Sequence, residues 1–327
     1  MDVTDLKVVA AVARHGSMNK AASELNTVQS NVSARIRSLE DELGVALFQR
    51  SAKGVQVTPA GRRILPFADR LAKLLLDATS AARDDGQPRG ELEIGTLETT
   101  LALRLPRLIA RFAKDYPEVR PVVRTGTTCS LIQDVIDCKL EGAFVVGPVN
   151  HPELHSEVVF REELVLVTSP ALHRLADVAA AMNLKTVDFR LGCSYRQRLD
   201  TLLTSLGAPA PEPLEFGSIE AIIACVSAGV GVTLLPRGVV ANAAREGLVA
   251  VHELSPQLGE VETVFVRRID GYFSSALSTF LHSVRVDGAG ERQETDSSSP
   301  GELRNSASRS ITTASNMAAV PIRNSRL

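Results

Sequence analysis

The feature that most constrains this chain is a short helix near its N-terminus whose exposed side is small and polar. Val32, Ile36 and Leu39 recur at steps of four and three, so a helix over residues 28–43 has one apolar face. Its other side opens with Gln, Ser, Asn and Ser, whereas a solvated helix usually carries mixed Glu and Lys. Gln and Asn can form two hydrogen bonds with adenine, and small hydroxyl residues allow close approach to a base. The pattern favours a helix that lies in the major groove of DNA.

Two shorter helices precede this one in a tight arrangement. An apolar stripe over residues 6–13 stops at Gly16, and Ser17 is the predicted N-cap of a second helix. Asn26 supplies a turn and Thr27 a second cap before the third helix. Helix-turn-helix spacing presents such a third helix to DNA, although three short helices also occur in bundles that bind no nucleic acid.

A hairpin is expected directly after the third helix. Residues 47–58 predict two short strands around a Lys-Gly turn, and a hairpin beside such a helix is a wing. Arg50 and Lys53 in the wing, with Arg35 and Arg37 on the helix, are expected to hold phosphates. The expected DNA-contacting residues are Gln29, Ser30, Asn31, Ser33, Arg35, Arg37, Arg50 and Lys53.

A long helix follows the wing. Thr58 is its predicted N-cap, and Pro59 stands at the first helical position, where its missing N–H is not needed. The apolar face continues to about Arg83, and Pro66 near the start is expected to bend the helix. A helix with a broad apolar face needs a partner, and a second copy of the same chain is the simplest one. We therefore expect a homo-oligomer.

The residues of this region also carry a family resemblance, in a fixed order. They are Gly16, Ser17, Ala21, Ala22, Leu25, Gln29, Ser30, Ser33, Ile36, Leu39, Glu40, Leu43, Gly44, Leu47, Phe48, Arg50, Thr58, Pro59, Ala60 and Gly61. This run resembles the N-terminal signature of LysR-type transcriptional regulators, except that many members have Pro where this chain has Ser30. The resemblance implies an all-α winged helix-turn-helix over residues 1–60, a dimerising linker helix over 59–84, and a C-terminal domain that senses a small molecule.

Strands and helices alternate beyond a polar, turn-rich stretch at residues 84–90. Strands are predicted at 92–94, 119–124, 143–146 and 164–168, and helices up to 114, over 131–140 and over 219–228. This alternation predicts an α/β fold with a mainly parallel sheet.

Ligands of such sheets bind beyond the carboxyl ends of the strands, where the helices begin. Three of these ends carry hydroxyl groups, at Thr99 and Thr100, at Thr127, Thr128 and Ser130, and at Ser218. Together with backbone N–H groups, the hydroxyls would hold a small anion or a carboxylate. The alternative is that each of them only caps a helix.

The resemblance extends to this part of the chain. The matching residues are Gly95, Leu105, Pro106, Phe112, Tyr116, Pro117, Gly126, Leu140 to Ala143 and Gly229 to Pro236, with Glu141 where many members have Asp. They resemble the effector domain of the same family, an α/β domain like that of periplasmic binding proteins. The resemblance implies an effector domain over 91–287, with lobe one at 91–161 and 268–287 and lobe two at 162–267. Ser194 and Arg196 would border the inducer cleft from lobe two.

Charge is distributed unevenly along the chain. Residues 1–90 hold thirteen Lys and Arg against ten Asp and Glu, and residues 91–287 hold eighteen against twenty-four. Any polyanion is therefore expected to meet the first ninety residues. Residues 288–327, with eight Ser and no aromatic residue, are expected to be a disordered tail.

The expected partners follow from these features. They are double-stranded DNA at an operator or promoter, a small-molecule inducer, a second copy of the chain in a homo-dimer or homo-tetramer, and RNA polymerase as a further candidate. No apolar run approaches eighteen residues and no secretion signal is present, so a cytoplasmic protein that meets no membrane is expected.

The sequence supports three other functions less well. An enzyme is disfavoured because the six His residues show no catalytic spacing and no Gly-x-Ser-x-Gly, phosphate loop or His-Glu-x-x-His occurs. A binding protein without DNA function would not explain the first sixty residues. A redox sensor would use Cys193, the one thiol near the expected cleft, although a small buried residue is the plainer reading. No cofactor and no metal are expected, since the four cysteines form no Cys-x-x-Cys pair.

Overall fold

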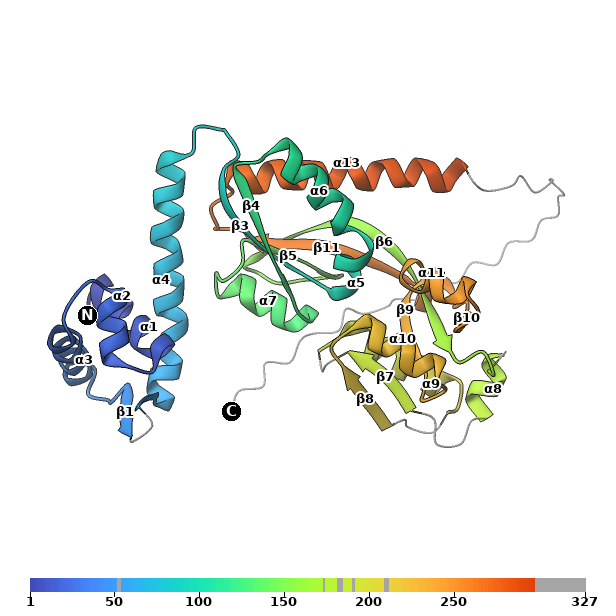
Figure 1. The fold of residues 1–327 in the computed structure, drawn as a ribbon, viewed down its shortest axis with the longest axis horizontal. Coiled ribbons are helices and arrows are strands. Elements are labelled where there is room, and N and C mark those ends of the chain that lie inside the picture. Colours follow the sequence, from blue (N-terminus) through green and yellow to red (C-terminus); the bar gives the residue numbers. More distant parts are fainter. Residues whose placement is uncertain (52–53, 173, 181–184, 190–191, 209–211, 298–327) are drawn as a thin grey trace. The chain divides into compact units, whose positions relative to one another are not determined.

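The N-terminal part of the chain consists of short helices, a hairpin and a long helix (Figure 1). The computed structural model describes residues 1–51, 54–172, 174–180, 185–189, 192–208 and 212–297. Its first elements are α1 (Val3–His15), α2 (Met18–Glu24), α3 (Gln29–Leu43), β1 (Phe48–Ser51), β2 (Gly54–Val57) and α4 (Pro59–Arg83). Strands β1 and β2 pair antiparallel, as expected of a wing.

The apolar sides of the short helices form a common core. Val9 of α1, Ala21 of α2 and Ile36 of α3 are at most 3% exposed and belong to one cluster with Leu47. Asn26, in the turn before α3, has a φ of 51°, a left-handed conformation that Asn adopts more readily than most residues. Local apolar spacing therefore determines this part of the fold.

The start of α3 differs from the prediction. Val28 rather than Thr27 occupies the N-cap position, and it makes no side-chain cap hydrogen bond. The Thr27 hydroxyl instead accepts a hydrogen bond of 3.1 Å from Asn31 Nδ2. The helix begins one residue later than a Thr27 cap would set it, so that hydroxyl bonds a side chain of the first turn.

Helix α4 begins as predicted. The Thr58 hydroxyl accepts a hydrogen bond of 3.0 Å from the Gly61 N–H, and Pro59 stands in the first turn. Several large apolar side chains along it are exposed to solvent, namely Phe67, Leu74, Leu75 and Leu76.

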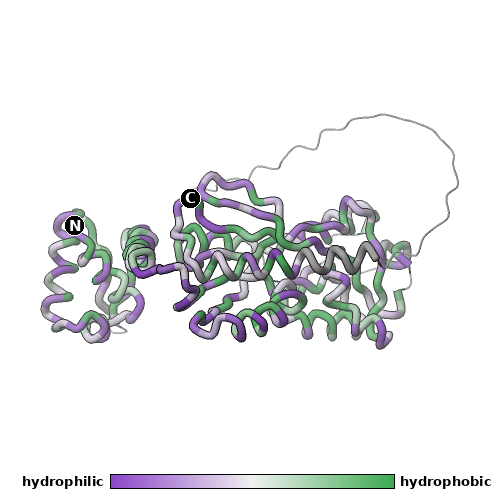
Figure 2. The backbone as a smooth tube through the Cα atoms, turned by 90° about the horizontal axis from the view of Figure 1, so that it is seen from above, coloured by the Kyte–Doolittle hydropathy of each residue, from purple (hydrophilic) through white to green (hydrophobic). Residues whose placement is uncertain are grey.

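The rest of the described chain alternates strands and helices. Its strands are β3 (Gly90–Thr96), β4 (Val119–Thr125), β5 (Gly142–Val146), β6 (Leu154–Thr168), β7 (Lys185–Phe189), β8 (Glu212–Phe216), β9 (Thr233–Pro236), β10 (Ala250–His252) and β11 (Glu260–Arg268). Its helices are α5 (Glu98–Leu103), α6 (Leu105–Asp115), α7 (Thr128–Ile136), α8 (Leu175–Ala180), α9 (Ser194–Ser205), α10 (Ile219–Ser227), α11 (Arg237–Arg245), α12 (Pro256–Gly259) and α13 (Ser275–Ser297). Hydrophilic and hydrophobic stretches alternate along many of these helices (Figure 2), as expected where one side packs and the other meets water.

The long strand β6 connects two groups of strands. Residues 154–163 of β6 pair with β11, and β11 continues through β5 and β3 to β4; we call this group the first sheet region. Residues 164–168 pair with β9 and β10. With the parallel pair β7–β8, which a Val187 N–H bond to the Val232 carbonyl joins to this group, they form the second sheet region.

The prediction of a mainly parallel sheet is wrong. Strands β3, β4 and β5 are parallel neighbours, and so are β7 and β8, but β6 pairs antiparallel with β9, β10 and β11. The antiparallel pairs involve residues more than a hundred positions apart in the chain, as between Leu154 and Arg268. Local alternation of strands and helices carries no signal for such distant partners.

Helices cover both faces of the first sheet region. Leu108 and Phe112 of α6 and Phe280 of α13 belong to one core cluster with Phe144 and Phe265 of the sheet. The side chains of α7 belong to the cluster on the other face, with the alternate residues of β5. Because successive residues of a strand point to opposite faces, β5, which is buried on both faces, is apolar throughout.

Two predicted helices in this region have different bounds. The segment up to residue 114 is broken at Arg104 into α5 and α6, because Pro106 in the first turn of α6 lacks an N–H and disfavours a continuous helix. Helix α7 ends at Ile136 rather than near 140, and Cys138, expected within it, follows it with a φ of 60°. The Lys139 N–H bonds back to the Asp134 carbonyl at 2.8 Å and so ends the helix.

The structure also differs from the predicted disordered tail at residues 288–327. Helix α13 runs to Ser297, so residues 288–297, predicted to be disordered, are helical. Residues 298–327 lie outside the described residues.

Gly142 tests the packing of β5 against β11. A Cβ atom at this position would lie 2.2 Å from Phe265 Cζ and 2.9 Å from the Val266 carbonyl oxygen. Because that overlap must displace a buried ring or a strand, Gly142→Ala should lower the free energy of unfolding by about 1–3 kcal/mol. A lower urea midpoint, followed by far-UV circular dichroism, is expected. Ser278→Ala, at an exposed position of α13, is the control and should change stability by less than about 0.5 kcal/mol.

Candidate functional site

The exposed side of α3 carries polar residues of its first turn. Gln29, Ser30 and Asn31 are exposed, whereas Ser33 is only 7% exposed. Gln29 Nε2 donates a hydrogen bond of 2.8 Å to Ser33 Oγ. Ser33 therefore orients the Gln29 amide, and the exposed amides of Gln29 and Asn31 have the donors and acceptors that a base edge requires.

The residues expected to hold phosphates lie in different environments. Arg35 Nη1 is 2.7 Å from Asp5 Oδ1, and this hydrogen bond raises the pKa of Arg35. Arg37 is exposed, and the structure shows no ion pair for it with the described residues. Arg50 lies in β1, and Lys53 lies outside the described residues. Of these residues, Arg37 has an exposed side chain without an internal counter-charge.

A cavity of about 510 Å³ lies at the carboxyl ends of β3, β4, β5, β7 and β8, where the following helices begin. Both sheet regions contribute to it. It is lined by Leu97, Glu98, Thr99, Thr125, Gly126, Thr127, Thr128, Ser130, Val146, Phe189, Cys193, Ser194, Tyr195, Phe216 and Gly217. Its size is in the range of pockets for small molecules.

One end of the cavity is the start of α7. Thr127 and Ser130 form a capping box, in which the Thr127 N–H donates to Ser130 Oγ at 2.9 Å and the Ser130 N–H to Thr127 Oγ1 at 3.3 Å. The next two N–H groups, of Thr128 and Cys129, have no hydrogen-bond acceptor in the described part of the chain. These two groups carry the partial positive charge of the helix start and are available to a ligand.

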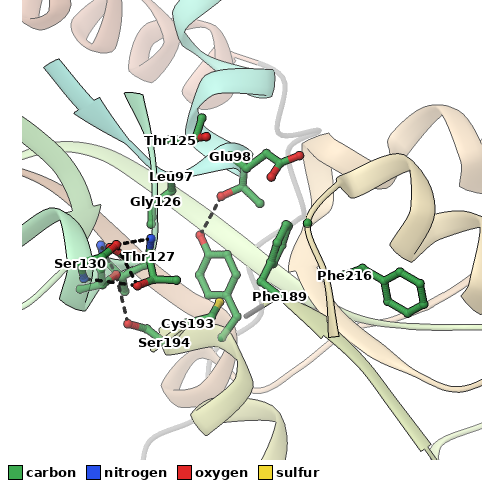
Figure 3. A pocket seen from close by; sticks show the side chains of 15 residues that line it. Leu97, Glu98, Thr125, Gly126, Thr127, Ser130, Phe189, Cys193, Ser194 and Phe216 are labelled. Carbon is green, nitrogen blue, oxygen red and sulfur yellow. Dashed lines mark hydrogen bonds between the residues drawn. The ribbon is translucent and has the colours of Figure 1, made fainter. Parts of the chain in front are cut away.

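Hydrogen bonds connect the two sheet regions across the cavity. Ser194 Oγ donates to Thr128 Oγ1 at 3.3 Å, and the Thr99 and Tyr195 hydroxyls lie 3.5 Å apart (Figure 3). The Ile219 N–H, at the start of α10, donates to Glu98 Oε1 at 3.2 Å. Residues that line the cavity therefore also link its two sides.

The charged side chain that lines the cavity is a carboxylate, that of Glu98. Among the residues that the structure describes, the cavity lining contains no Lys, Arg or His, and Glu98 is the acidic residue among these lining side chains. Burial raises the pKa of Glu98, and the hydrogen bond from Ile219 opposes this effect. Burial also raises the pKa values of the Cys193 thiol and of the Tyr195 hydroxyl, so both remain protonated at neutral pH.

The predicted effector-binding residues divide into two groups. Those that line the cavity are Thr99, Thr127, Thr128, Ser130 and Ser194. Thr100, Arg196 and Ser218 do not line it. Thr100 is 5% exposed, Arg196 forms an ion pair of 2.8 Å with Glu215, and the Ser218 hydroxyl caps α10 by accepting from the Ala221 N–H at 3.2 Å.

Other lining residues were not among those predicted. Glu98 directly precedes Thr99, and its position after a strand end is the sequence signal that could have identified it. Phe189 and Phe216 end the parallel strands β7 and β8, and Tyr195 lies in the first turn of α9. The pairing of β7 with β8 decides their proximity, and the sequence carries no direct sign of it.

Family models match two parts of the chain. Residues 3–62 match the model described as "Bacterial regulatory helix-turn-helix protein, lysR family". Residues 85–287 match the model described as "LysR substrate binding domain".

Relatives match over most of their length. The chain is 42% identical to the transcriptional regulator YofA of Bacillus subtilis over 284 residues, which are 87% of this chain and 98% of the relative. It is 40% identical to the transcriptional regulator GltR of the same organism over 285 residues, which are 87% of this chain and 96% of the relative. Both are named as helix-turn-helix regulators and not as enzymes.

Solved structures share the fold. A full-length OxyR from Pseudomonas aeruginosa has a TM-score of 0.66 at 20% identity, covering 88% of this chain and 95% of that chain. Full-length CbnR in complex with its target DNA has a TM-score of 0.62 at 23% identity, covering 88% of this chain and 99% of that chain. At 20% and 23% sequence identity, these matches show that the fold is shared and nothing further.

The described residues contain neither a membrane-spanning helix nor a metal-binding cluster. None of the helices there is both long and apolar enough to pass through a membrane. No group of three or more His, Cys, Asp or Glu side chains in that part of the chain is placed to hold a metal ion.

The thiols of Cys193 and Cys129 should differ in reactivity. Cys129 is exposed, whereas burial raises the pKa of Cys193, and the thiolate is the form that reacts. In the native protein, iodoacetamide should therefore alkylate Cys129 much faster than Cys193, as measured by peptide mass spectrometry. The two rates should converge in urea. Faster native labelling of Cys193 would restore the redox-sensor alternative.

Proposed function

Because the chain belongs to the LysR family of bacterial transcriptional regulators, we propose that it binds one operator sequence through α3 and changes its activity when a small molecule occupies the cavity at the strand ends. The observation that carries this proposal is a single chain with a polar, exposed α3 and a cavity lined from two sheet regions. In this proposal, α3 selects the DNA sequence that is bound, and the cavity selects the small molecule that changes the protein's activity.

The DNA contact is proposed from the surface of α3. Gln29 and Asn31 have exposed amides that suit adenine, and Ser30 between them is small enough for the helix to approach the base pairs. Arg37 would hold a phosphate, and Arg50 and Lys53 would do so from the wing. Val32 and Ile36, which are at most 3% exposed, anchor the helix from behind.

A homo-dimer is proposed from α4. Phe67, Leu74 and Leu76 are each more than 60% exposed, which is unusual for large apolar side chains on one helix. A second α4 would cover them and would set two copies of α3 on a two-fold DNA site. Two such dimers would form a tetramer. In the cytoplasm, the protein bound at a promoter would be able to contact RNA polymerase.

The proposed signal acts through the two sheet regions of residues 91–287. These differ from the expected lobes, because β11, most of which was expected in lobe two, belongs to the first sheet region. An acid group of the ligand would accept from the free N–H groups at the start of α7. Thr128 and Ser194, which bond each other across the cavity, would then also meet the ligand. A ligand that binds one arrangement of the two regions better than another shifts the balance between them, and the dimer transmits this shift to the DNA-binding helices.

Gln29 tests the reading of bases. Gln29→Ala should weaken binding to the specific operator by about 1–3 kcal/mol for a lost bidentate contact, and should weaken binding to random DNA much less. The measurement is fluorescence anisotropy with both duplexes at fixed salt. Arg37→Ala is the control, because loss of a phosphate contact should weaken both alike and reduce the salt slope by about one unit. An unchanged ratio of specific to random affinity in Gln29→Ala would contradict the proposed role of α3.

Thr128 tests the cavity. Thr128→Val keeps the size of the side chain but removes the hydroxyl that accepts from Ser194. The effect of inducer on operator binding should be lost, while operator affinity without inducer should stay the same. Thr100→Val is the matched control, since Thr100 is equally buried but does not line the cavity. Equal dose-response curves for wild type and Thr128→Val would argue against this cavity as the effector site.

A further inference from the structure

The cavity combines groups of opposite character at separate places. Figure 3 shows Thr127 and Ser130 on one side of the site and Glu98 on another, beside Phe189. The first place offers N–H groups and hydroxyls, which suit an anion. The second offers a carboxylate, which repels an anion and attracts a cation.

Glu98 lacks a counter-charge. The hydrogen bond that it receives comes from the neutral N–H of Ile219, and the charged group that acts on its pKa is another carboxylate, Glu220. No Lys or Arg forms an ion pair with it in the described part of the chain. A partly buried carboxylate without a cation is unfavourable.

Two other carboxylates have cationic partners. Glu162 is 2.8 Å from Arg104 Nε, and Glu163 is 2.8 Å from Arg237 Nε. Glu98 lines the cavity and has no such cation among the described residues, which leaves its counter-charge to a ligand.

We propose that the effector is a zwitterion, an amino acid or a closely related amino carboxylate, whose ammonium group binds Glu98 while its carboxylate binds the start of α7. This inference rests on the proposed function of the cavity and names the ligand class that it takes. The cavity volume of about 510 Å³ leaves room for a side chain, and the Phe189 ring, beside Glu98, supplies an apolar surface for it. An ammonium group on Glu98 would also replace the missing counter-charge between the two sheet regions.

A ligand that needs its ammonium group should bind much more tightly than the same molecule without it. Matched pairs that differ only in the amino group, such as L-leucine and 4-methylpentanoate or L-phenylalanine and 3-phenylpropanoate, should bind differently. With the full chain in a thermal-shift screen of the protein amino acids and their des-amino counterparts, at least one amino acid should raise the melting temperature. Its des-amino counterpart should not do so at the same concentration.

Glu98→Gln then tests the contact. The amide oxygen of Gln can still accept from the Ile219 N–H, so the link to α10 is kept and only the charge is removed. The dissociation constant for the amino acid found in the screen, measured by titration calorimetry, should rise at least about tenfold, as expected for loss of a charged hydrogen bond. Glu220→Gln is the matched control: this exposed carboxylate is next to the same helix start but does not line the cavity, so affinity should stay within about twofold of wild type.

The outcomes separate this inference from the proposed function. Equal binding of the des-amino acid, unchanged affinity in Glu98→Gln, or no response to any amino acid of the screen would overturn the zwitterion proposal. Operator binding by the same preparations, measured by anisotropy, tests the regulator itself. A des-amino acid that alters operator binding would leave the proposed function intact with a different ligand class, whereas a chain that prefers no duplex over any other would lose both.

Discussion

Strand β6 holds the effector-binding part of the molecule together, because its two halves pair with different partners. Up to Glu163 it is bonded to β11, and from Leu164 onward to β9 and β10. One continuous strand thus joins the two sheet regions, and the strand ends that line the cavity come from both. The cavity exists because two sets of helix starts are held facing the same space, and the hydrogen bonds across it, such as that between Ser194 and Thr128, depend on this framework.

The sequence predicted best those features that depend on neighbouring residues. The steps between Val32, Ile36 and Leu39 placed α3 and its buried face correctly, because helix periodicity is local. Prediction from the sequence failed for strand pairs whose members lie far apart in the chain. The antiparallel partners of β6 could not be read from an alternating pattern, and Pro106 broke a helix that composition alone would have continued.

The same contrast applies to the candidate site. Hydroxyls at strand ends were easy to find, and structural placement then separated Thr99, which lines the cavity, from Thr100, which does not. Arg196 looked like a source of positive charge until its partner Glu215 was seen on β8. Glu98 was missed because its environment depends on Ile219, which is 121 positions away in the chain. Electrostatic character comes from such distant neighbours, and no window along the sequence contains them.

The ion pair of Arg35 has a further consequence for how the protein meets a polyanion. Asp5 and Asp2 form the capping box of α1, and both also lie within 4 Å of Arg35 on α3, so its counter-charge is already part of the protein. If Arg35 moved to a phosphate, it would leave the two aspartates uncompensated, and they would gather cations from solution as the DNA released its own. The cations released from the DNA by Arg35 would then be roughly balanced by the cations that the two aspartates take up. Counting the basic residues of the recognition surface would therefore overstate how strongly ionic strength governs its affinity.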